Sequence, residues 1–189
     1  MKYFILFITL SLSSFMQKDF YEKLSDATLS IVDNTIEYNS RYAQLSYPNG
    51  DVPKGQGVCT DVVIRAYRKL GIDLQKEVHE DMAANFRKYP KIWGLKSTDT
   101  NIDHRRVPNL QTFFTRKGTS IPVTKTATDY KPGDIVTWKL ASGVPHIGLV
   151  VNKKDVNGRN KIVHNIGHGQ VLEDVLFEYE VTGHYRYKK

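Results

Sequence analysis

The stretch Gly57-Val58-Cys59-Thr60-Asp61-Val62-Val63-Ile64-Arg65 carries the only cysteine of the 189-residue chain. A glycine-rich loop leads into it, and the apolar residues that follow recur at helical spacing, so Cys59 stands at the start of an expected helix. Unpaired backbone N–H groups and the positive end of the helix macrodipole favour a thiolate there. Cys59 is therefore the candidate nucleophile. The alternative is a buried cysteine that acts as a small hydrophobic side chain.

The first residues have the pattern of an export signal. Lys2 precedes a short apolar run at 3–10, and small residues follow at 11–14. The run is short for a membrane-spanning helix, and no cysteine follows it that could carry a lipid anchor. We expect residues 1–16 to be a signal peptide, with the cleavage point left open, and residues 17–189 to form a single domain. The alternative for the apolar run is a buried first element of the fold.

Export would also explain why the thiol is single. Oxidising compartments favour cysteines in pairs, and one cysteine cannot form an internal disulfide. A lone thiol in such a compartment is exposed to oxidation, so its presence favours a reactive role. We therefore expect an exported protein, periplasmic or extracellular, without stable membrane insertion once the signal is cleaved.

Composition bounds the possible partners. The chain is 40% hydrophobic and 25% charged, which is typical of one globular domain with an ordinary core. The formal net charge is +7, and would be +6 without Lys2 of the signal, which suits attraction to an anionic polymer or simply a soluble basic surface. The basic residues are scattered, without aromatic residues between them in a run, so we expect no nucleic-acid partner.

Apolar periodicity divides the chain into a helical first half and a strand-rich second half. Helical spacing predicts helices at 20–39, 60–70 and 74–89, and a shorter one that is capped by Asn109 and ends at Gly118. Alternation and turn signals predict strands at 121–124, 134–139, 146–152, 161–165, 175–179 and 183–187. This segregation indicates an α+β fold, with N-terminal helices packed on a C-terminal antiparallel sheet.

Two histidines are candidates to serve the cysteine, because a cysteine nucleophile needs a general base and a group that orients that base. His146 opens one predicted strand and His164 ends the next, and Asn157-Gly158 between them indicates a hairpin. Pairing would place both histidines at one end of the hairpin, where the helix of Cys59 can meet them. We assign His146 as base and His164 as third polar group, and expect Asn165 to face the other side of the strand.

These residues, in this order, resemble the NlpC/P60 branch of the papain-like cysteine peptidases. The resemblance rests on the helix-start cysteine, on Gly133-Asp134-Ile135-Val136-Thr137-Trp138, on His146-Ile147-Gly148-Leu149-Val150 and on a polar residue in the next strand. It implies a papain-like fold and the roles just given to the cysteine and the two histidines. It also implies that Tyr47, in the loop before the cysteine, lies at the substrate site.

A more specific resemblance, to the bacterial domain-of-unknown-function 1287 family, covers almost all of residues 17–189. It rests on long motifs in one order: 57–65, 78–82, 101–110, 145–148 and 164–167. This resemblance implies no activity, which has to come from the broader NlpC/P60 one. The chain also departs from NlpC/P60 proteins at Thr60-Asp61, because typical members carry Asp-Cys-Ser-Gly around the cysteine.

The chemistry of these groups indicates cleavage of an amide bond. Cys59 would attack the carbonyl to form a thioester while His146 protonates the departing amine. The backbone N–H of Cys59 is the expected oxyanion donor, and Gln56 is a candidate for a second one. Export and the NlpC/P60 resemblance together indicate peptidoglycan or a peptide as substrate.

The charged loop around Asn101 is the candidate for substrate recognition. His104, Arg105 and Arg106 are assigned to substrate binding, because arginine forms bidentate bonds with a carboxylate. The alternative is that Asp103 and Arg105 hold the loop together and never meet a ligand.

No cofactor site is indicated. The chain has no Walker loop, dinucleotide fingerprint or paired Cys-x-x-Cys motif. His79, Glu80 and Asp81 lack the two-histidine spacing of a helical zinc motif. We therefore expect neither a metal nor a cofactor.

Three functions stay open at this stage. The first is an exported cysteine hydrolase. The second, a thiol acyltransferase or lipid-directed hydrolase on the same fold, would need a wide apolar groove beside Cys59. The third is a non-catalytic cell-wall-binding module, in which Cys59 would be buried. A monomer is the default expectation for the oligomeric state.

Overall fold

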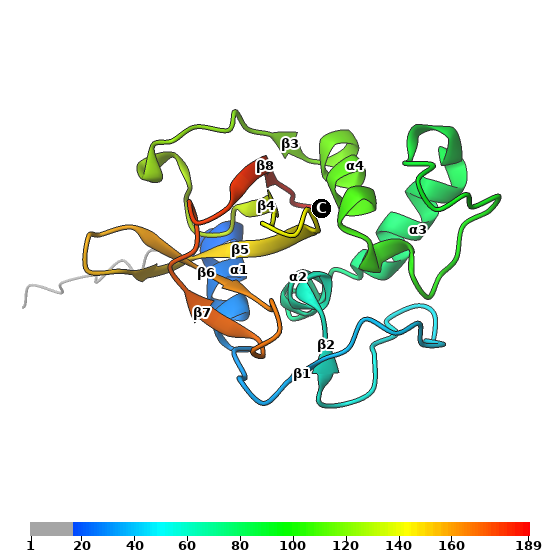
Figure 1. The fold of residues 1–189 in the computed structure, drawn as a ribbon, viewed down its shortest axis with the longest axis horizontal. Coiled ribbons are helices and arrows are strands. Elements are labelled where there is room, and N and C mark those ends of the chain that lie inside the picture. The colour runs from blue at the N-terminus through cyan, green and yellow to red at the C-terminus, as the bar shows by residue number, and fades with distance from the viewer. Residues whose placement is uncertain (1–16) are drawn as a thin grey trace, which may run out of the picture.

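A computed structural model describes residues 17–189 (Figure 1). The expected signal peptide, residues 1–16, lies outside the described part. The helices are α1 (Phe20–Leu29), α2 (Cys59–Arg68), α3 (Leu74–Ala84) and α4 (Val107–Lys117), with short 3₁₀ turns that include η2 (Asp103–Arg105). Among residues 17–189, none of the helices has the length and apolar character needed to span a bilayer.

Six strands form one antiparallel sheet in the order β3-β8-β4-β5-β6-β7. Their bounds are β3 (Thr119–Ser120), β4 (Ile135–Lys139), β5 (Pro145–Lys154), β6 (Asn160–His164), β7 (Val171–Glu173) and β8 (Glu180–Arg186). A separate parallel pair joins β1 (Glu37–Tyr38) to β2 (Gln56–Gly57). Figure 1 shows α2, α3 and α4 gathered beside the sheet, with the parallel pair next to α2. The predicted α+β architecture, with helices packed on an antiparallel sheet, is confirmed.

The pleat of the central strands β4 and β5 builds a core on each face of the sheet. Ile135 and Ile147 face the helices and share one buried cluster with Val63 of α2. Val136 and Trp138 point to the opposite face, where the second cluster lies. With apolar side chains on both faces, the middle of the sheet is inaccessible, and functional groups are left to its rim.

The Gly133-Asp134 pair at the start of β4 has a structural role. The fully buried Asp134 carboxylate accepts hydrogen bonds from His184, at 2.6 Å, and from Arg186, so it ties β4 to β8. Gly133 has φ +84°, and a Cβ there would lie 2.7 Å from Cβ of Tyr21. The motif therefore fixes how α1 and β8 meet the sheet.

The first helix is shorter than predicted, and this changes the site. The predicted helix 20–39 is wrong beyond Leu29, because Asp33 turns the chain there. Its carboxylate accepts hydrogen bonds from the backbone N–H and the hydroxyl of Thr35, at 2.9 and 2.6 Å, and its backbone bridges to Gln170. The segment that follows is thereby free to form β1 at 37–38.

The other helices match their predictions more closely. α2 begins at Cys59, as expected, while α3 ends at Ala84, five residues earlier than predicted. α4 begins at Val107, so Asn109 is not its cap. The Asn109 side chain instead donates to the backbone carbonyl of Asp103, 3.0 Å away.

Two predicted strands are wrong. Residues 121–124 form no strand, and the edge strand β3 lies just before them at 119–120. Residues 175–179 also form no strand, and the chain pairs with β6 earlier, at 171–173. The apolar side chains of 175–179 are instead used to cover the outer face of the sheet, where the Leu176 carbonyl accepts the indole N–H of Trp138 at 3.0 Å.

Gly148 lets β5 and β6 approach each other next to the candidate histidines. A Cβ at this position would lie 2.7 Å from Cγ2 of Ile162 and 3.1 Å from Cβ of His164. We expect Gly148→Ala to lower the free energy of unfolding by about 1–3 kcal/mol through overpacking, measured by urea denaturation. The control Val144→Ala, at an exposed position before β5, should change it by less than about 0.5 kcal/mol. Equal stability of Gly148→Ala and wild type would contradict this close approach.

Candidate functional site

Cys59 is the first residue of α2, and a carboxylate of the helix itself caps its N-terminus. Val58 is the N-cap residue and has no capping side chain. Its backbone N–H instead donates to Oδ2 of Asp61 at 2.7 Å. The carboxylate three residues further along therefore stabilises the helix start in place of a capping side chain. The sulfur is thereby set against the start of β5, and Cys59 is only 5% exposed.

Burial decides the charge of Cys59 in the resting protein. It raises the pKa of the thiol to about 12, and the nearby Asp61 carboxylate raises it further, although backbone N–H groups of Ile147 and Thr60 oppose this. The thiolate expected from the helix position alone is therefore wrong for the resting state. The favourable N–H groups are present, as predicted, but the loss of water outweighs them.

Three side chains on β5, β6 and β7 form a hydrogen-bonded relay. Nε2 of His146 lies 2.9 Å from Nδ1 of His164, and Nε2 of His164 lies 2.9 Å from a carboxylate oxygen of Glu173. The predicted placement of the two histidines side by side is confirmed. Glu173 was not identified from the sequence, because it lies on the short strand β7 that the pattern did not predict.

The carboxylate at one end sets the proton positions along the relay. A carboxylate only accepts hydrogen bonds, so Nε2 of His164 donates to Glu173, and Nδ1 of a neutral His164 must accept from His146. This leaves Nδ1 of His146 as an unprotonated base. Burial, and then His164, lowers the pKa of His146 to about 3, which keeps the ring neutral at physiological pH.

The sulfur and the relay meet at the start of β5. The backbone N–H of Ile147, which follows His146, favours the Cys59 thiolate, and Pro145, which precedes it, lines the same pocket as Cys59. Within residues 17–189, no direct hydrogen bond joins the sulfur to the His146 ring. Asn165 turns to the other side of its strand, as predicted, and donates to the Gly57 carbonyl at 3.3 Å.

Cys59 opens onto a pocket of about 270 Å³. Most of the residues that line it are apolar, and they come from segments that lie far apart in the sequence. It is lined by Tyr38, Ser40, Val58, Cys59, Ile92, Trp93, Ile102, Arg105, Arg106, Val107, Pro108 and Pro145. The guanidinium of Arg106 lies over the ring of Trp93, 4.3 Å from its centroid.

The tyrosine in this pocket is Tyr38 and not Tyr47. Tyr47 packs edge-on against His79, with ring centroids 5.3 Å apart, and does not line the pocket. Tyr38 arrives through the parallel pairing of β1 with β2, which sets it opposite Gly57, two residues before the cysteine. Burial, and then the nearby Cys59, raises the pKa of its phenol, so the hydroxyl keeps its proton.

Two other predicted site residues also lie outside the pocket. Gln56 faces the other side of β2, and its side-chain oxygen accepts a hydrogen bond from Asn39 at 3.1 Å. His104 is 1% exposed, and burial lowers its pKa to about 3. Neither side chain is placed to meet a substrate in this pocket, so Gln56 as oxyanion donor and His104 as substrate residue are corrected.

The two arginines of the charged loop differ in their use. Arg105 makes a bidentate ion pair with Asp61, with both N···O distances 3.0 Å, and its remaining donors reach the backbone carbonyls of Asn39 and Arg41. It therefore has the structural role that the sequence left open. Arg106 lines the pocket with Nη1 buried and without a hydrogen-bond partner in residues 17–189.

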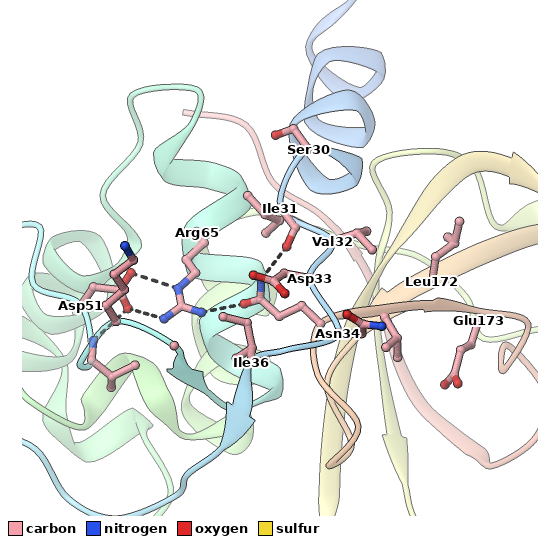
Figure 2. A pocket seen from close by; sticks show the side chains of 15 residues that line it. Ser30, Ile31, Val32, Asp33, Asn34, Ile36, Asp51, Arg65, Leu172 and Glu173 are labelled. Carbon is pink, nitrogen blue, oxygen red and sulfur yellow. Dashed lines mark hydrogen bonds and ion pairs between the residues drawn. The ribbon is translucent and has the colours of Figure 1, made fainter.

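A larger groove, of about 1080 Å³, lies on another face (Figure 2). Its central cation, Arg65, is already bound to Asp51, as Figure 2 shows, and it also donates to the side-chain oxygen of Gln170. Arg65 therefore makes a structural ion pair with Asp51. Glu173 projects at the edge of this groove, which is how the relay reaches solvent.

Comparison by sequence finds close relatives. The family described as "Domain of unknown function (DUF1287)" matches residues 25–187. "Uncharacterized protein YijF" of Escherichia coli (strain K12) is 51% identical over 164 residues, which cover 87% of this chain and 80% of the relative. The motifs from which the family was predicted therefore belong to a match over most of the chain.

Comparison by structure finds the same fold in two NlpC proteins and in an amidase. NlpC1 and NlpC2 of Trichomonas vaginalis superpose with TM-scores of 0.51 and 0.53 at 16% identity. They match 93% and 96% of this chain, which spans about half of their lengths, 47% and 51%. An N-acetylmuramoyl-L-alanine amidase from Bacteroides uniformis has a TM-score of 0.51 at 12% identity, over 89% of this chain and 99% of that protein. The predicted NlpC/P60-type fold is confirmed.

The raised pKa of Cys59 predicts slow alkylation of the native protein. Because the folded-state pKa lies above that of an ordinary thiol, the thiolate fraction at neutral pH is smaller in the folded than in the unfolded protein. We expect iodoacetamide to react more than about tenfold more slowly at pH 7.5 with native protein than with protein unfolded in urea. The native rate should rise between about pH 9 and pH 11, as the pH approaches the raised pKa of the thiol. A plateau below about pH 8 would contradict the neutral thiol.

Proposed function

This chain belongs to the DUF1287 family, and we propose that it is an exported cysteine hydrolase that cleaves an amide bond in peptidoglycan peptides. The observation that carries the proposal is the His146–His164–Glu173 relay, whose first residue directly precedes Ile147, the residue whose backbone N–H faces the helix-start cysteine. The substrate class rests on the shared fold, because one protein with that fold is an N-acetylmuramoyl-L-alanine amidase. The export signal at residues 1–16 gives access to a cell wall.

In the proposed reaction, His146 acts as a general base on a neutral thiol. As the sulfur of Cys59 attacks the amide carbonyl, its proton passes to Nδ1 of His146, and then to the nitrogen that leaves as an amine. The resulting thioester is attacked by water, whose proton passes to His146 and back to the sulfur. The products are a carboxylic acid and an amine, and the thiol is restored.

Two hydrogen-bond donors are available for the negative charge that forms on the carbonyl oxygen during attack. The backbone N–H of Cys59 belongs to the first turn of α2, where N–H groups have no partner within the helix. The phenol of Tyr38 lines the same pocket and keeps its proton. We assign these two groups to the oxyanion, with Tyr38 in place of Gln56.

Burial of both reacting groups makes the proton transfer depend on the relay. The transfer creates a thiolate and an imidazolium together, and their attraction offsets part of the cost that burial imposes on each charge alone. The imidazolium continues to donate through Nε2 to His164, whose other nitrogen is bound to the Glu173 carboxylate. Glu173 thus supplies the negative charge that stabilises the protonated base from a distance.

The two alternative functions, a wall-binding module and an enzyme for acyl-chain substrates, can each be compared with one feature of the site. The low exposure of Cys59 is what a non-catalytic wall-binding module predicts, so this function is the second candidate. Such a module has no need of a hydrogen-bonded His–His–Glu relay at the start of β5. The pocket is short and contains an unpaired guanidinium, which disfavours the long apolar groove that an acyl-chain substrate needs.

Removal of the nucleophile or the base tests the proposal directly. We expect Cys59→Ala and His146→Ala to lower the rate of amide cleavage in purified peptidoglycan by roughly 10⁴-fold or more, because each removes a group that acts in the transition state. The released muropeptides are measured by mass spectrometry. His168→Ala, at an exposed histidine, is the matched control and should keep the wild-type rate. Release of fragments by Cys59→Ala at the wild-type rate would exclude the cysteine mechanism.

Glu173 should act as a positioning residue. Glu173→Ala removes the acceptor that holds His164, and we expect kcat to fall about ten- to a hundredfold. Glu173→Gln keeps an acceptor oxygen but no charge, and its loss should be smaller. Because Glu173 raises the pKa of His164, both variants should move the acid limb of the pH–rate profile to lower pH. An unmoved limb would mean that Glu173 has only a structural role, and Glu180→Gln, at an exposed glutamate of β8, controls for lost surface charge.

A further inference from the structure

The pocket beside Cys59 carries positive charge without a matching acid. Two of its lining residues are arginines, and none is an aspartate or glutamate. Arg105 is neutralised by Asp61, as described above. Arg106 is left as the cation of the pocket, with Nη1 buried and unbonded in the described residues.

The nearby acids make their hydrogen bonds to other groups, although Oδ1 of Asp103 has no partner among residues 17–189. Oδ2 of Asp103 accepts from the backbone N–H of Asp99, at 2.8 Å, and lies 2.9 Å from Nδ1 of His79. The Asp99 carboxylate accepts from the hydroxyl of Tyr42, at 3.0 Å, and from Asn101. Both acids favour the charged guanidinium from a distance, but within residues 17–189 neither forms an ion pair with it.

A guanidinium in this state is built to receive an anion. A buried donor without a partner is unfavourable, and a carboxylate can satisfy two guanidinium N–H groups at once. The Trp93 ring under the guanidinium restricts its plane, so less conformational freedom is lost when a ligand binds.

We propose that Arg106 and Trp93 form a carboxylate subsite, so that the substrate is an amide flanked by a small residue with a free carboxylate. This inference rests on the proposed function, whose Cys59 lines the same pocket. The volume of about 270 Å³ is at the lower end for small-molecule sites, so it holds a small residue and not a long chain. The apolar walls at Ile92, Val107 and Pro108 suit a short aliphatic side chain.

The test measures binding apart from cleavage. The probes are N-acetyl-DL-alanine and its carboxamide, which differ by one charge at the same size, and the protein is the uncleaving Cys59→Ala variant. The chain has two tryptophans, so NMR shows two indole N–H signals. The Trp93 signal should respond to the probe, while Trp138, which is buried, does not line the pocket and donates its indole N–H to the Leu176 carbonyl, serves as internal reference.

We expect the carboxylate to bind about ten- to a hundredfold more tightly than the carboxamide. Adding Arg106→Gln should remove this preference. Arg106→Lys should keep part of it, because a lysine retains the charge but not the planar, bidentate geometry. Lys188→Gln removes a cation near another ring, that of Phe20 at 5.9 Å, and should leave the preference unchanged. An unchanged Trp138 signal confirms that each variant is folded.

Equal affinity for the two probes in Cys59→Ala would overturn the subsite, and so would a preference that survives Arg106→Gln. These outcomes are separate from a failure of the proposed function. If wild type cleaves wall peptides but Cys59→Ala shows no preference, only the subsite is wrong. If wild type cleaves none and the preference depends on Arg106, the subsite stands as a binding site and the hydrolase is wrong.

Discussion

The buried ion pair between Arg105 and Asp61 holds the functional parts of this protein together. The two side chains are only 2% and 4% exposed, and Nε and Nη2 of Arg105 each donate to one oxygen of the Asp61 carboxylate. Asp61 also receives the N–H of Val58, which defines where α2 begins, and Arg105 also binds the carbonyl of Asn39, next to Tyr38. Removal of one partner would leave an uncompensated buried charge, at a cost of about 3–5 kcal/mol. One interaction thus sets the positions of the cysteine, the tyrosine and the substrate loop.

The closeness of this packing also determines the resting chemistry. Water is excluded from Cys59 and His146, so the pKa of the thiol is raised and that of the imidazole is lowered. Neither group is charged until a proton moves between them, and the only fixed charge in the relay is on Glu173, at the solvent edge. A site of this kind keeps its nucleophile unreactive toward oxidants and small electrophiles in the absence of substrate. This property fits the export that we propose, which would carry the lone thiol into an oxidising compartment.

Sequence reasoning succeeded where local patterns determine structure, and it failed where long-range pairing does. The helix start at Cys59 and the hairpin that joins His146 to His164 follow from capping, periodicity and a turn signal. Tyr38 was assigned to a helix, because the Asx turn at Asp33 and its bridge to Gln170 had no visible signal in the pattern. Glu173 lies on a three-residue strand, which is too short for alternation to be recognised.

The charged loop shows how a dense pattern can combine a structural role with a proposed binding role. Arg105 and Arg106 are neighbours, and at Arg106 the backbone is extended, with φ −113° and ψ 114°. Arg105 ends the 3₁₀ turn η2 and its guanidinium reaches inward to Asp61, while that of Arg106 lies over the Trp93 ring at the pocket wall. The first satisfies a buried acid and the second is left without a partner. The sequence presented structural locking and substrate recognition as alternatives for the loop; Arg105 has the first role, and we propose the second for its neighbour Arg106.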